Sequence, residues 1–158
     1  MGPVLTSLCY IRSDGNTLMI NKLRGSQRGM WNGLGGKFDP GETPEDCVRR
    51  EVLEESGLTL GKLNYRGLLT FPAFADKEDI YTFVFTAEDF RGTLRDSSEG
   101  RLFWVPDKDV MGLNLYEGDR VFLKWLNQER VFSARLDYKQ GSFTGYEVDF
   151  YPSGLEEA

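Results

Sequence analysis

Three glutamates are spaced so that, on a helix, they must share one face. Glu51, Glu54 and Glu55 stand at positions i, i+3 and i+4 within the stretch from Gly36 to Leu58, and side chains with this spacing are neighbours on a helix surface. Adjacent carboxylates repel one another and weaken a helix unless a cation neutralises them. The stretch therefore predicts either a solvated acidic face or a helix that binds a hard divalent cation such as Mg²⁺.

The ends of this helix are marked in the sequence. Thr43 can act as the N-cap, Pro44 suits the first helical position, and Asp46 can complete a capping box. Gly57 can end the helix in the left-handed conformation. We therefore expect a helix from about Pro44 to Ser56.

Two further features orient the helix. Val48 and Val52 stand at i and i+4, so they should stack toward a core. Arg50 lies four residues before Glu54 and could pair with it or with Glu42, which would hold a carboxylate in place. In that role Arg50 orients a glutamate and does not touch a substrate.

The chain contains no histidine. Hydrolytic schemes that pair serine or cysteine with histidine are therefore excluded. A general base must be a carboxylate, a lysine, a tyrosine or a bound hydroxide. A cluster of carboxylates that holds Mg²⁺ could neutralise a polyphosphate and lower the pKa of a bound water.

Composition and charge narrow the class of protein. The 158 residues, 40% of them hydrophobic, suit one globular domain over residues 1–158. The net charge of −6 argues against binding to long nucleic acid, which needs a basic surface. A small phosphorylated ligand remains compatible, because a bound cation would reverse the local charge. The oligomeric state stays open.

Cysteine usage and the lack of long apolar stretches bear on location. Cys9 and Cys47 have no disulfide-framework spacing, which favours a reduced, cytoplasmic setting. The first residues do not resemble a signal peptide. No stretch is long and apolar enough to span a membrane, so we expect no membrane contact.

The remaining pattern predicts strands and one more helix. An apolar stripe with helical spacing indicates a helix over residues 118–128. The order β-β-β-α-β-β-β-α-β-β argues for an α/β protein with a mixed sheet. Residues 75–78 should form a short hairpin loop, and the acidic tail 152–158 should be frayed. Seven of these eight strands are expected over residues 4–11, 17–21, 62–74, 79–86, 101–105, 131–138 and 143–151.

The spacing of the central stretch resembles the Nudix box, the signature of hydrolases that cleave nucleoside diphosphates linked to another group. The match fills every fixed position of that signature. Counted out, the stretch reads Gly36, five residues, Glu42, seven residues, Arg50-Glu51-Val52, one residue, Glu54-Glu55, one residue and Gly57-Leu58.

The resemblance extends over roughly Thr6 to Tyr151 and is strongest to the MutT/MutX antimutator branch, which acts on oxidised purine nucleoside triphosphates. It implies the Nudix α/β/α sandwich with a mixed β-sheet. The segments that carry it outside the box are Trp31–Lys37, Thr70–Pro72 and Val148–Tyr151.

The resemblance also implies a set of site residues around a divalent cation. The cofactor would be Mg²⁺, with Mn²⁺ as a substitute. Either Glu51 or Glu54 would serve as the general base, and Arg50 completes the catalytic set by orienting a glutamate. The expected metal ligands are the carbonyl of Gly36 and the carboxylates of Glu51, Glu54, Glu55 and Glu99.

Lysines and aromatic residues are the candidates for contact with the rest of a nucleotide. Lys22 ends a strand that should point toward the glycine-rich turn, where Lys37 also lies, so both could meet phosphates. The other cations near Lys22 could equally form a solvated basic loop. Phe71 and Phe74 flank a proline, which suggests a strand end that opens onto a pocket where a purine could stack.

Three residues are candidates for recognition of the base. The amide of Asn32 offers a donor and an acceptor to a purine edge, although it could also merely stabilise a turn. Asp119 could accept from a guanine N1–H or exocyclic amine, and Tyr116 could stack. Some members of the branch have two adjacent aspartates here. The order Tyr116-Glu117-Gly118-Asp119 is closer to the bacterial MutX-like members and leaves the base preference open.

These features lead to one leading hypothesis and two alternatives. The leading hypothesis is a Mg²⁺-dependent pyrophosphohydrolase that converts a purine nucleoside triphosphate such as 8-oxo-dGTP to the monophosphate and pyrophosphate. The first alternative keeps the chemistry but acts on an ordinary nucleotide, a nucleotide sugar or a dinucleoside polyphosphate. The second is a catalytically silent nucleotide-binding module. All three have a small nucleotide as partner.

Overall fold

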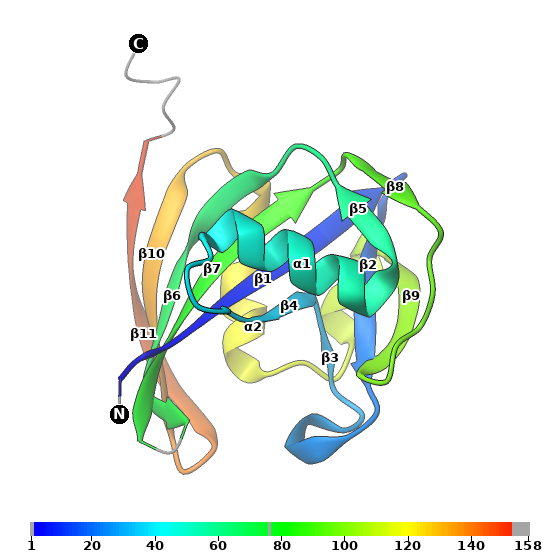
Figure 1. Cartoon of the computed structure of the whole chain (residues 1–158). Coiled ribbons are helices and arrows are strands. Elements are labelled where there is room, and N and C mark those ends of the chain that lie inside the picture. Colours follow the sequence, from blue (N-terminus) through cyan, green and yellow to red (C-terminus); the bar gives the residue numbers. More distant parts are fainter. Residues whose placement is uncertain (1, 76, 153–158) are drawn as a thin grey trace.

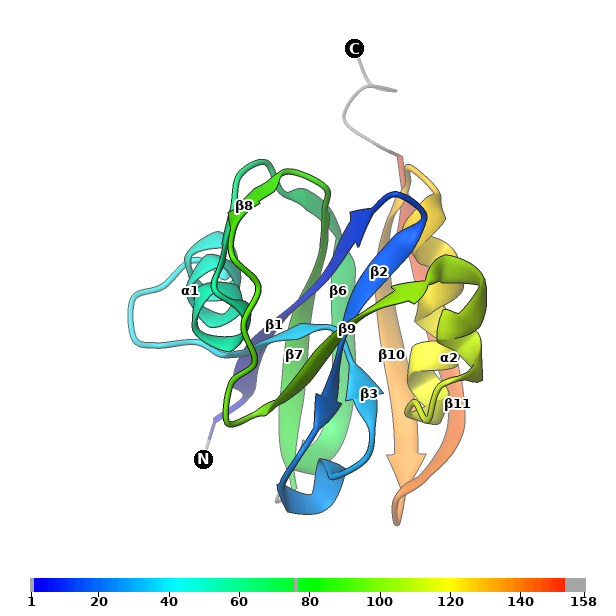
Figure 2. The same ribbon diagram turned by 90° about the vertical axis from the view of Figure 1, so that its right-hand side faces the viewer.

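A mixed β-sheet lies between two helices that cover its opposite faces (Figure 1). The computed structural model describes residues 2–75 and 77–152. Asp76 of the expected hairpin loop and residues 153–158 of the expected frayed tail lie outside the described residues. Seen from the side, α1 (Pro44–Ser56) and α2 (Glu117–Phe122) stand on either side of the sheet (Figure 2). The predicted α/β/α sandwich is confirmed.

The sheet combines parallel and antiparallel pairs. Its order is β11-β10-β6-β7-β1-β2-β3, with β4 also paired to β1 and β9 to β2. The pairs β1–β7 and β10–β6 are parallel, and the others along this path are antiparallel. The strands are β1 Val4–Ser13, β2 Asn16–Lys22, β3 Trp31–Asn32, β4 Leu34–Lys37, β5 Leu58–Leu60, β6 Asn64–Ala75, β7 Glu78–Ala87, β8 Phe90–Gly92, β9 Gly100–Pro106, β10 Val131–Lys139 and β11 Ser142–Tyr151.

Strand β1 is the centre of the molecule. Over residues 4–11 it pairs with β7 on one side, and over residues 6–9 it pairs with β4 on the other. Only its last two residues, Arg12 and Ser13, pair with β2. The glycine-rich β4 is therefore fixed directly beside β1.

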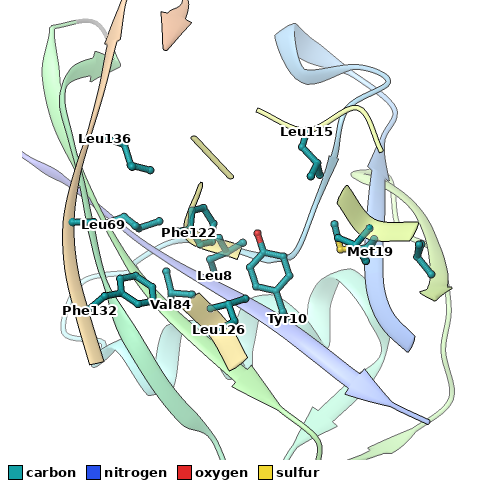
Figure 3. Close-up of a cluster of buried hydrophobic side chains, with 13 residues drawn as sticks. Leu8, Tyr10, Met19, Leu69, Val84, Leu115, Phe122, Leu126, Phe132 and Leu136 are labelled. Carbon is teal, nitrogen blue, oxygen red and sulfur yellow. The ribbon is translucent and has the colours of Figure 1, made fainter. Parts of the chain in front are cut away.

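The alternation of β1 supplies both hydrophobic cores. Leu8 and Tyr10 belong to the cluster on the α2 side, which also contains Phe122, whereas Cys9 and Ile11 belong to the cluster on the α1 side. Successive strand residues point to opposite faces of a sheet, so one strand can serve both clusters. Figure 3 shows the α2-side cluster, with Tyr10 beside Phe122.

The second helix differs from the single helix expected over residues 118–128. It is α-helical only over Glu117–Phe122 and continues as a 3₁₀ helix over Leu123–Asn127. Such tighter turns are common at helix ends. The apolar stripe still packs inward, since Phe122 and Leu126 are buried. The other 3₁₀ helices are Gly25–Gln27 and Asp107–Gly112.

Two further expectations concern cysteines and membranes. Cys9 and Cys47 are both free and buried. Within residues 2–75 and 77–152, no helix has the length and apolar character needed to cross a membrane.

Candidate active site

Helix α1 has the boundaries and caps that the sequence predicts. The Asp46 N–H donates to Thr43 Oγ1 at 3.0 Å, and the Thr43 N–H donates to Asp46 Oδ2 at 3.1 Å, which completes the capping box. Gly57 follows the helix with a φ of 80°. Val48 and Val52 are fully buried. Fixed at both ends and along one side, the helix holds its acidic face against β4.

The contact between α1 and β4 depends on two glycines. The Gly35 N–H donates to Glu55 Oε1 at 2.9 Å, and a β-carbon at Gly36 would lie 2.6 Å from Cδ of Glu51. A β-carbon at Gly35 would overlap the carbonyl oxygen of Ser7 on β1. Glycine at position 35 lets this strand lie beside β1, and glycine at position 36 leaves room for the Glu51 carboxylate.

Arg50 joins the helix to the loop that precedes it. Its guanidinium binds both carboxylate oxygens of Glu42, and it also reaches Glu54, so it makes both of the alternative pairs considered for it. Bidentate arginine–carboxylate pairs fix geometry well. Its contacts are Glu42 at 2.7 and 2.9 Å, Glu51 at 2.9 Å, the Lys37 carbonyl at 3.0 Å, Asp39 at 3.1 Å and Glu54 at 3.4 Å.

Burial raises the pKa values of two of the carboxylates. The pKa of Glu55 is raised to about 7, chiefly by burial and to a lesser extent by the charges of Glu51 and Glu99, against the opposing effects of Lys22 and the Gly35 N–H. Burial also raises the pKa of Glu51, against the effect of Arg50. A cation beside these groups would favour their ionised forms.

Every expected metal ligand lines one cavity of about 560 Å³, here called the carboxylate cavity. Glu55 is 4% exposed, whereas the side chain of Glu54 is 59% exposed. Across the described ranges, no three acidic or cysteine side chains already converge as a formed metal site. The donors are oxygens, which suits Mg²⁺ or Mn²⁺. The lining residues are Lys22, Gly35, Gly36, Lys37, Glu51, Glu54, Glu55, Ser97, Ser98 and Glu99.

A second cavity of about 330 Å³, here called the aromatic cavity, contains every expected substrate-contacting residue. Arg24 and Arg28, which neighbour Lys22 in the sequence, are not among the described residues that line either cavity. The predicted substrate-contacting residues in the wall of the aromatic cavity are Lys22, Asn32, Lys37, Phe71, Phe74, Tyr116 and Asp119.

An irregularity in β6 brings two aromatic rings into this cavity. Residues three apart on a regular strand point to opposite faces. The β6–β7 register shifts between Phe71 and Ala75, and Ala73 has a φ of 48°. The ring centroids of Phe71 and Phe74 consequently lie 5.4 Å apart.

Asn32 and Asp119 are two of the polar residues in the wall of the aromatic cavity. The Asn32 Oδ1 accepts from the Gly33 N–H at 2.8 Å and from the Tyr10 hydroxyl at 3.4 Å. Asp119 is 7% exposed, and its buried Oδ2 has no hydrogen-bond partner within the described part of the chain. Burial raises the pKa of Asp119 to about 7, against the effect of Arg120.

Some residues of the site were not anticipated. Tyr138 contacts Phe71, Phe74 and Tyr116, and its hydroxyl accepts from the Gly118 N–H at 2.7 Å. The period-2 burial of β10 places Tyr138 on the core-facing side and could have signalled it.

A thiol behind the glycines also escaped prediction. Cys47 Sγ lies 3.1 Å from Ser7 Oγ and 3.4 Å from the Gly36 carbonyl oxygen. No local sequence signal identifies this contact, because its partners come from β1 and β4.

The two cavities share part of their lining. Lys22, Gly35, Gly36 and Lys37 line both of them. One elongated molecule could therefore have a polyphosphate beside the carboxylates and an aromatic base among the rings.

Comparison with known proteins agrees with this geometry. The family model described as NUDIX domain matches residues 3–126. The oxidized purine nucleoside triphosphate hydrolase of Mus musculus is 32% identical over 151 residues, covering 93% of this chain and 97% of the mouse protein. The Danio rerio protein of the same name is 33% identical over 144 residues, covering 91% and 89%.

The solved structures include close matches in fold. A MutT protein from Bacillus halodurans superposes with a TM-score of 0.83 at 25% identity, covering 92% of this chain and 97% of that one. A MutT Nudix hydrolase from Burkholderia pseudomallei has a TM-score of 0.69 at 26% identity, covering 80% of this chain and 100% of the other.

Proposed function

The chain belongs to the NUDIX family and is a Nudix hydrolase, and we propose that it converts an oxidised purine nucleoside triphosphate, such as 8-oxo-dGTP, to the monophosphate and pyrophosphate. The observation that carries this proposal is that the carboxylate and aromatic cavities adjoin, since Lys22, Gly35, Gly36 and Lys37 line both. A nucleoside triphosphate has a charged polyphosphate at one end, which suits the carboxylate cavity, and an aromatic base at the other end, which suits the aromatic cavity.

The carboxylate cavity fits a divalent cation. Its donors would be the Gly36 carbonyl with Glu51, Glu54, Glu55 and Glu99, which are the hard oxygen ligands that Mg²⁺ and Mn²⁺ accept. When bound, the cation would stabilise negative charge on the polyphosphate and lower the pKa of a water molecule.

The residues of α1 would then orient and deprotonate the attacking water. Either Glu51 or Glu54 is the general base, and the structural contacts leave that choice open, because both carboxylates also contact Arg50. Arg50 restricts the positions of these two side chains and is itself anchored by Glu42. Lys22 and Lys37, which line both cavities, would contact the phosphates between base and reaction centre.

The aromatic cavity suits a purine with a guanine-type edge. Phe71, Phe74 and Tyr116 would pack against the ring system. The unpaired Oδ2 of Asp119 would accept from a guanine N1–H or amino group, which would satisfy an otherwise orphaned buried oxygen. Asn32 would donate to the carbonyl oxygen on the same edge.

The names of the relatives support an oxidised base. The mouse and zebrafish proteins, which share about a third of their residues with this chain over nearly its whole length, are both named oxidized purine nucleoside triphosphate hydrolases. The net charge of −6 also favours a small nucleotide over a long nucleic acid.

The test is a steady-state comparison of 8-oxo-dGTP with dGTP, in Mg²⁺ and in EDTA, with pyrophosphate separated from single phosphate. We expect a higher kcat/KM for the oxidised nucleotide, pyrophosphate as the released product, and no turnover in EDTA. Equal rates on both nucleotides would reject the oxidised-base preference, and a panel of nucleotide sugars and dinucleoside polyphosphates would then identify the substrate. Nucleotide binding without turnover in Mg²⁺ would indicate a silent binding module.

A further inference from the structure

The hydroxyl of Tyr10 lies behind the wall of the aromatic cavity. Tyr10 is 1% exposed and belongs to β1. Its ring packs against Phe122, which lines the aromatic cavity, with ring centroids 6.2 Å apart. In Figure 3 the ring stands in the middle of the core cluster with its oxygen pointing away from β1.

This hydroxyl contacts Asn32, the last residue of β3, which directly precedes Gly33 and the glycine-rich β4. It donates to Asn32 Oδ1 at 3.4 Å. The Gly33 N–H donates to the same Asn32 oxygen at 2.8 Å. A β-carbon at Gly33 would lie 3.0 Å from the Tyr10 ring, so the Gly33 peptide rests on that ring.

These contacts determine which end of the Asn32 amide is available to a ligand. A carbonyl oxygen has two lone pairs, and both Asn32 Oδ1 lone pairs are engaged. A flipped amide would set its amino group against the Gly33 N–H, donor against donor. The Asn32 amino group is therefore the part left for a ligand in the aromatic cavity.

The charge of Asp119 acts on the same hydroxyl. Burial raises the pKa of the Tyr10 phenol well above its ordinary value, and the Asp119 charge is the next largest cause. The phenol thus keeps its proton and stays a donor at any working pH.

We propose that Tyr10 is a positioning residue for base selection, whose hydroxyl holds Asn32 with its amino group toward the ligand and thereby favours a 6-oxopurine over a 6-aminopurine. The carbonyl oxygen of a 6-oxopurine accepts from that amino group, whereas the amino group of adenine would oppose it. This inference rests on the proposed function, because it requires a purine in the aromatic cavity.

The experiment compares Tyr10→Phe with the unaltered protein on dGTP, 8-oxo-dGTP and dATP, well below the melting temperature of both. We expect kcat/KM for the two guanine nucleotides to fall about fivefold, through KM, the size of effect that loss of one hydrogen bond produces. The rate on dATP should not fall, so the guanine-to-adenine ratio drops. Tyr65→Phe, on the other face of the sheet, is the control and should leave the ratio unchanged.

A double mutant tests whether Tyr10 acts through Asn32. In an Asn32→Ala background, Tyr10→Phe should cause no further loss of selectivity. A further loss in that background, or an equal fall on all three nucleotides in the single variant, would overturn the proposal.

A measurement without substrate separates this inference from the proposed function. The side-chain amide signals of Asn32 in the NMR spectrum of the free protein should shift in Tyr10→Phe and not in Tyr65→Phe. Unmoved signals would reject the Tyr10 contact. A protein that turns over no purine nucleotide, yet shows the shift, would reject the proposed function and the base selection while retaining the Tyr10–Asn32 contact.

Discussion

The carboxylate of Glu51 occupies the space beside Gly36 that a β-carbon would need, since that carbon would lie 2.6 Å from Glu51 Cδ. The backbone of Gly36 is not in the left-handed region, so alanine is excluded there only by the carboxylate. The obstacle is the end of a flexible side chain, which can move aside. A substitution at Gly36 therefore tests the position of Glu51 without breaking the strand.

We predict that Gly36→Ala folds normally but loses activity. Displacing a catalytic group by about 1 Å can reduce the rate about a hundredfold. The measurement is kcat at saturating Mg²⁺ together with the melting temperature. Gly112→Ala is the control, because nothing lies within 4 Å of a β-carbon there. Full activity in Gly36→Ala would show that the place of Glu51 is unimportant.

Glu54→Gln and Glu55→Gln should each lose most turnover while the helix stays intact. Loss of an acid–base group or a cation ligand typically lowers the rate by about 10²–10⁴. Glutamine at position 55 can still accept from the Gly35 N–H, so folding should be preserved. Circular dichroism and kcat check this. Glu45→Gln, exposed in the first turn of the same helix, should behave as the unaltered protein, and retained turnover in both other variants would refute the assigned roles.

Arg50→Lys should weaken the response to Mg²⁺. A lysine cannot bind the two oxygens of Glu42 and reach Glu51 at the same time. The Mg²⁺ concentration for half-maximal activity should rise, and kcat should fall by at least about tenfold. A Mg²⁺ titration measures both. Arg49→Lys, one position earlier and hydrogen-bonded to the Gly61 carbonyl instead, should change neither.

Asp119→Asn should change the pH dependence of stability. Burial raises the pKa of Asp119 from 3.8 to about 7, so between these values the unfolded carboxyl is ionised while the folded one keeps its proton. Unfolding then releases a proton, and the free energy of unfolding falls as pH rises from about 4 to about 7. Asp119→Asn has no carboxyl to titrate at this position, so its free energy of unfolding does not fall in this way. The difference in the free energy of unfolding, variant minus unaltered protein, should therefore rise by about 2–3 kcal/mol from pH 5 to pH 8.

Urea unfolding at several pH values measures that difference. The exposed Asp109→Asn serves as the control. A difference between Asp119→Asn and the unaltered protein that does not vary with pH would mean that Asp119 ionises normally in the folded protein.

Phe74→Ala should raise KM for the nucleotide with little change in kcat. The Phe74 ring lies 5.2 Å from that of Tyr138 and 6.4 Å from that of Tyr116, in edge-on contacts. Loss of one aromatic contact to a base costs about 1 kcal/mol, or roughly a fivefold rise in KM. The control is Phe103→Ala, an exposed phenylalanine outside the wall of the aromatic cavity. An unchanged KM in Phe74→Ala would remove this ring from substrate contact.

Features that depend on neighbours in sequence were predictable. The capping box of Thr43, the position of Pro44 and the left-handed Gly57 each act within one helical turn, so the limits of α1 followed directly. The length of the second helix did not, because an apolar stripe of two turns indicates the side that faces the core and does not specify where the α-helix gives way to the observed 3₁₀ helix over Leu123–Asn127.

Features that depend on distant parts of the chain were harder to predict. The glycines of β4 indicated a tight bend, but the need for glycine at position 35 comes from Ser7, which only strand pairing brings close. Tyr138 likewise reaches the aromatic cavity through the packing of β10, and Tyr10 reaches Asn32 through the packing of β1. The anticipated residues do line the two cavities, because they were chosen by resemblance to a family whose fold brings these positions together. The roles of those residues stay predictions.

The carboxylate and aromatic cavities have separate origins in the chain. The acidic wall comes mainly from α1, whereas the rings and base-facing groups come from β6, α2 and neighbouring segments, and only Lys22, Gly35, Gly36 and Lys37 belong to both. Inherited variation in α2 or β6 can therefore alter which base is accepted without disturbing the hydrolytic helix. A family built on this plan can diversify its substrates while its reaction stays the same, and a protein engineer can retarget the enzyme at the same positions.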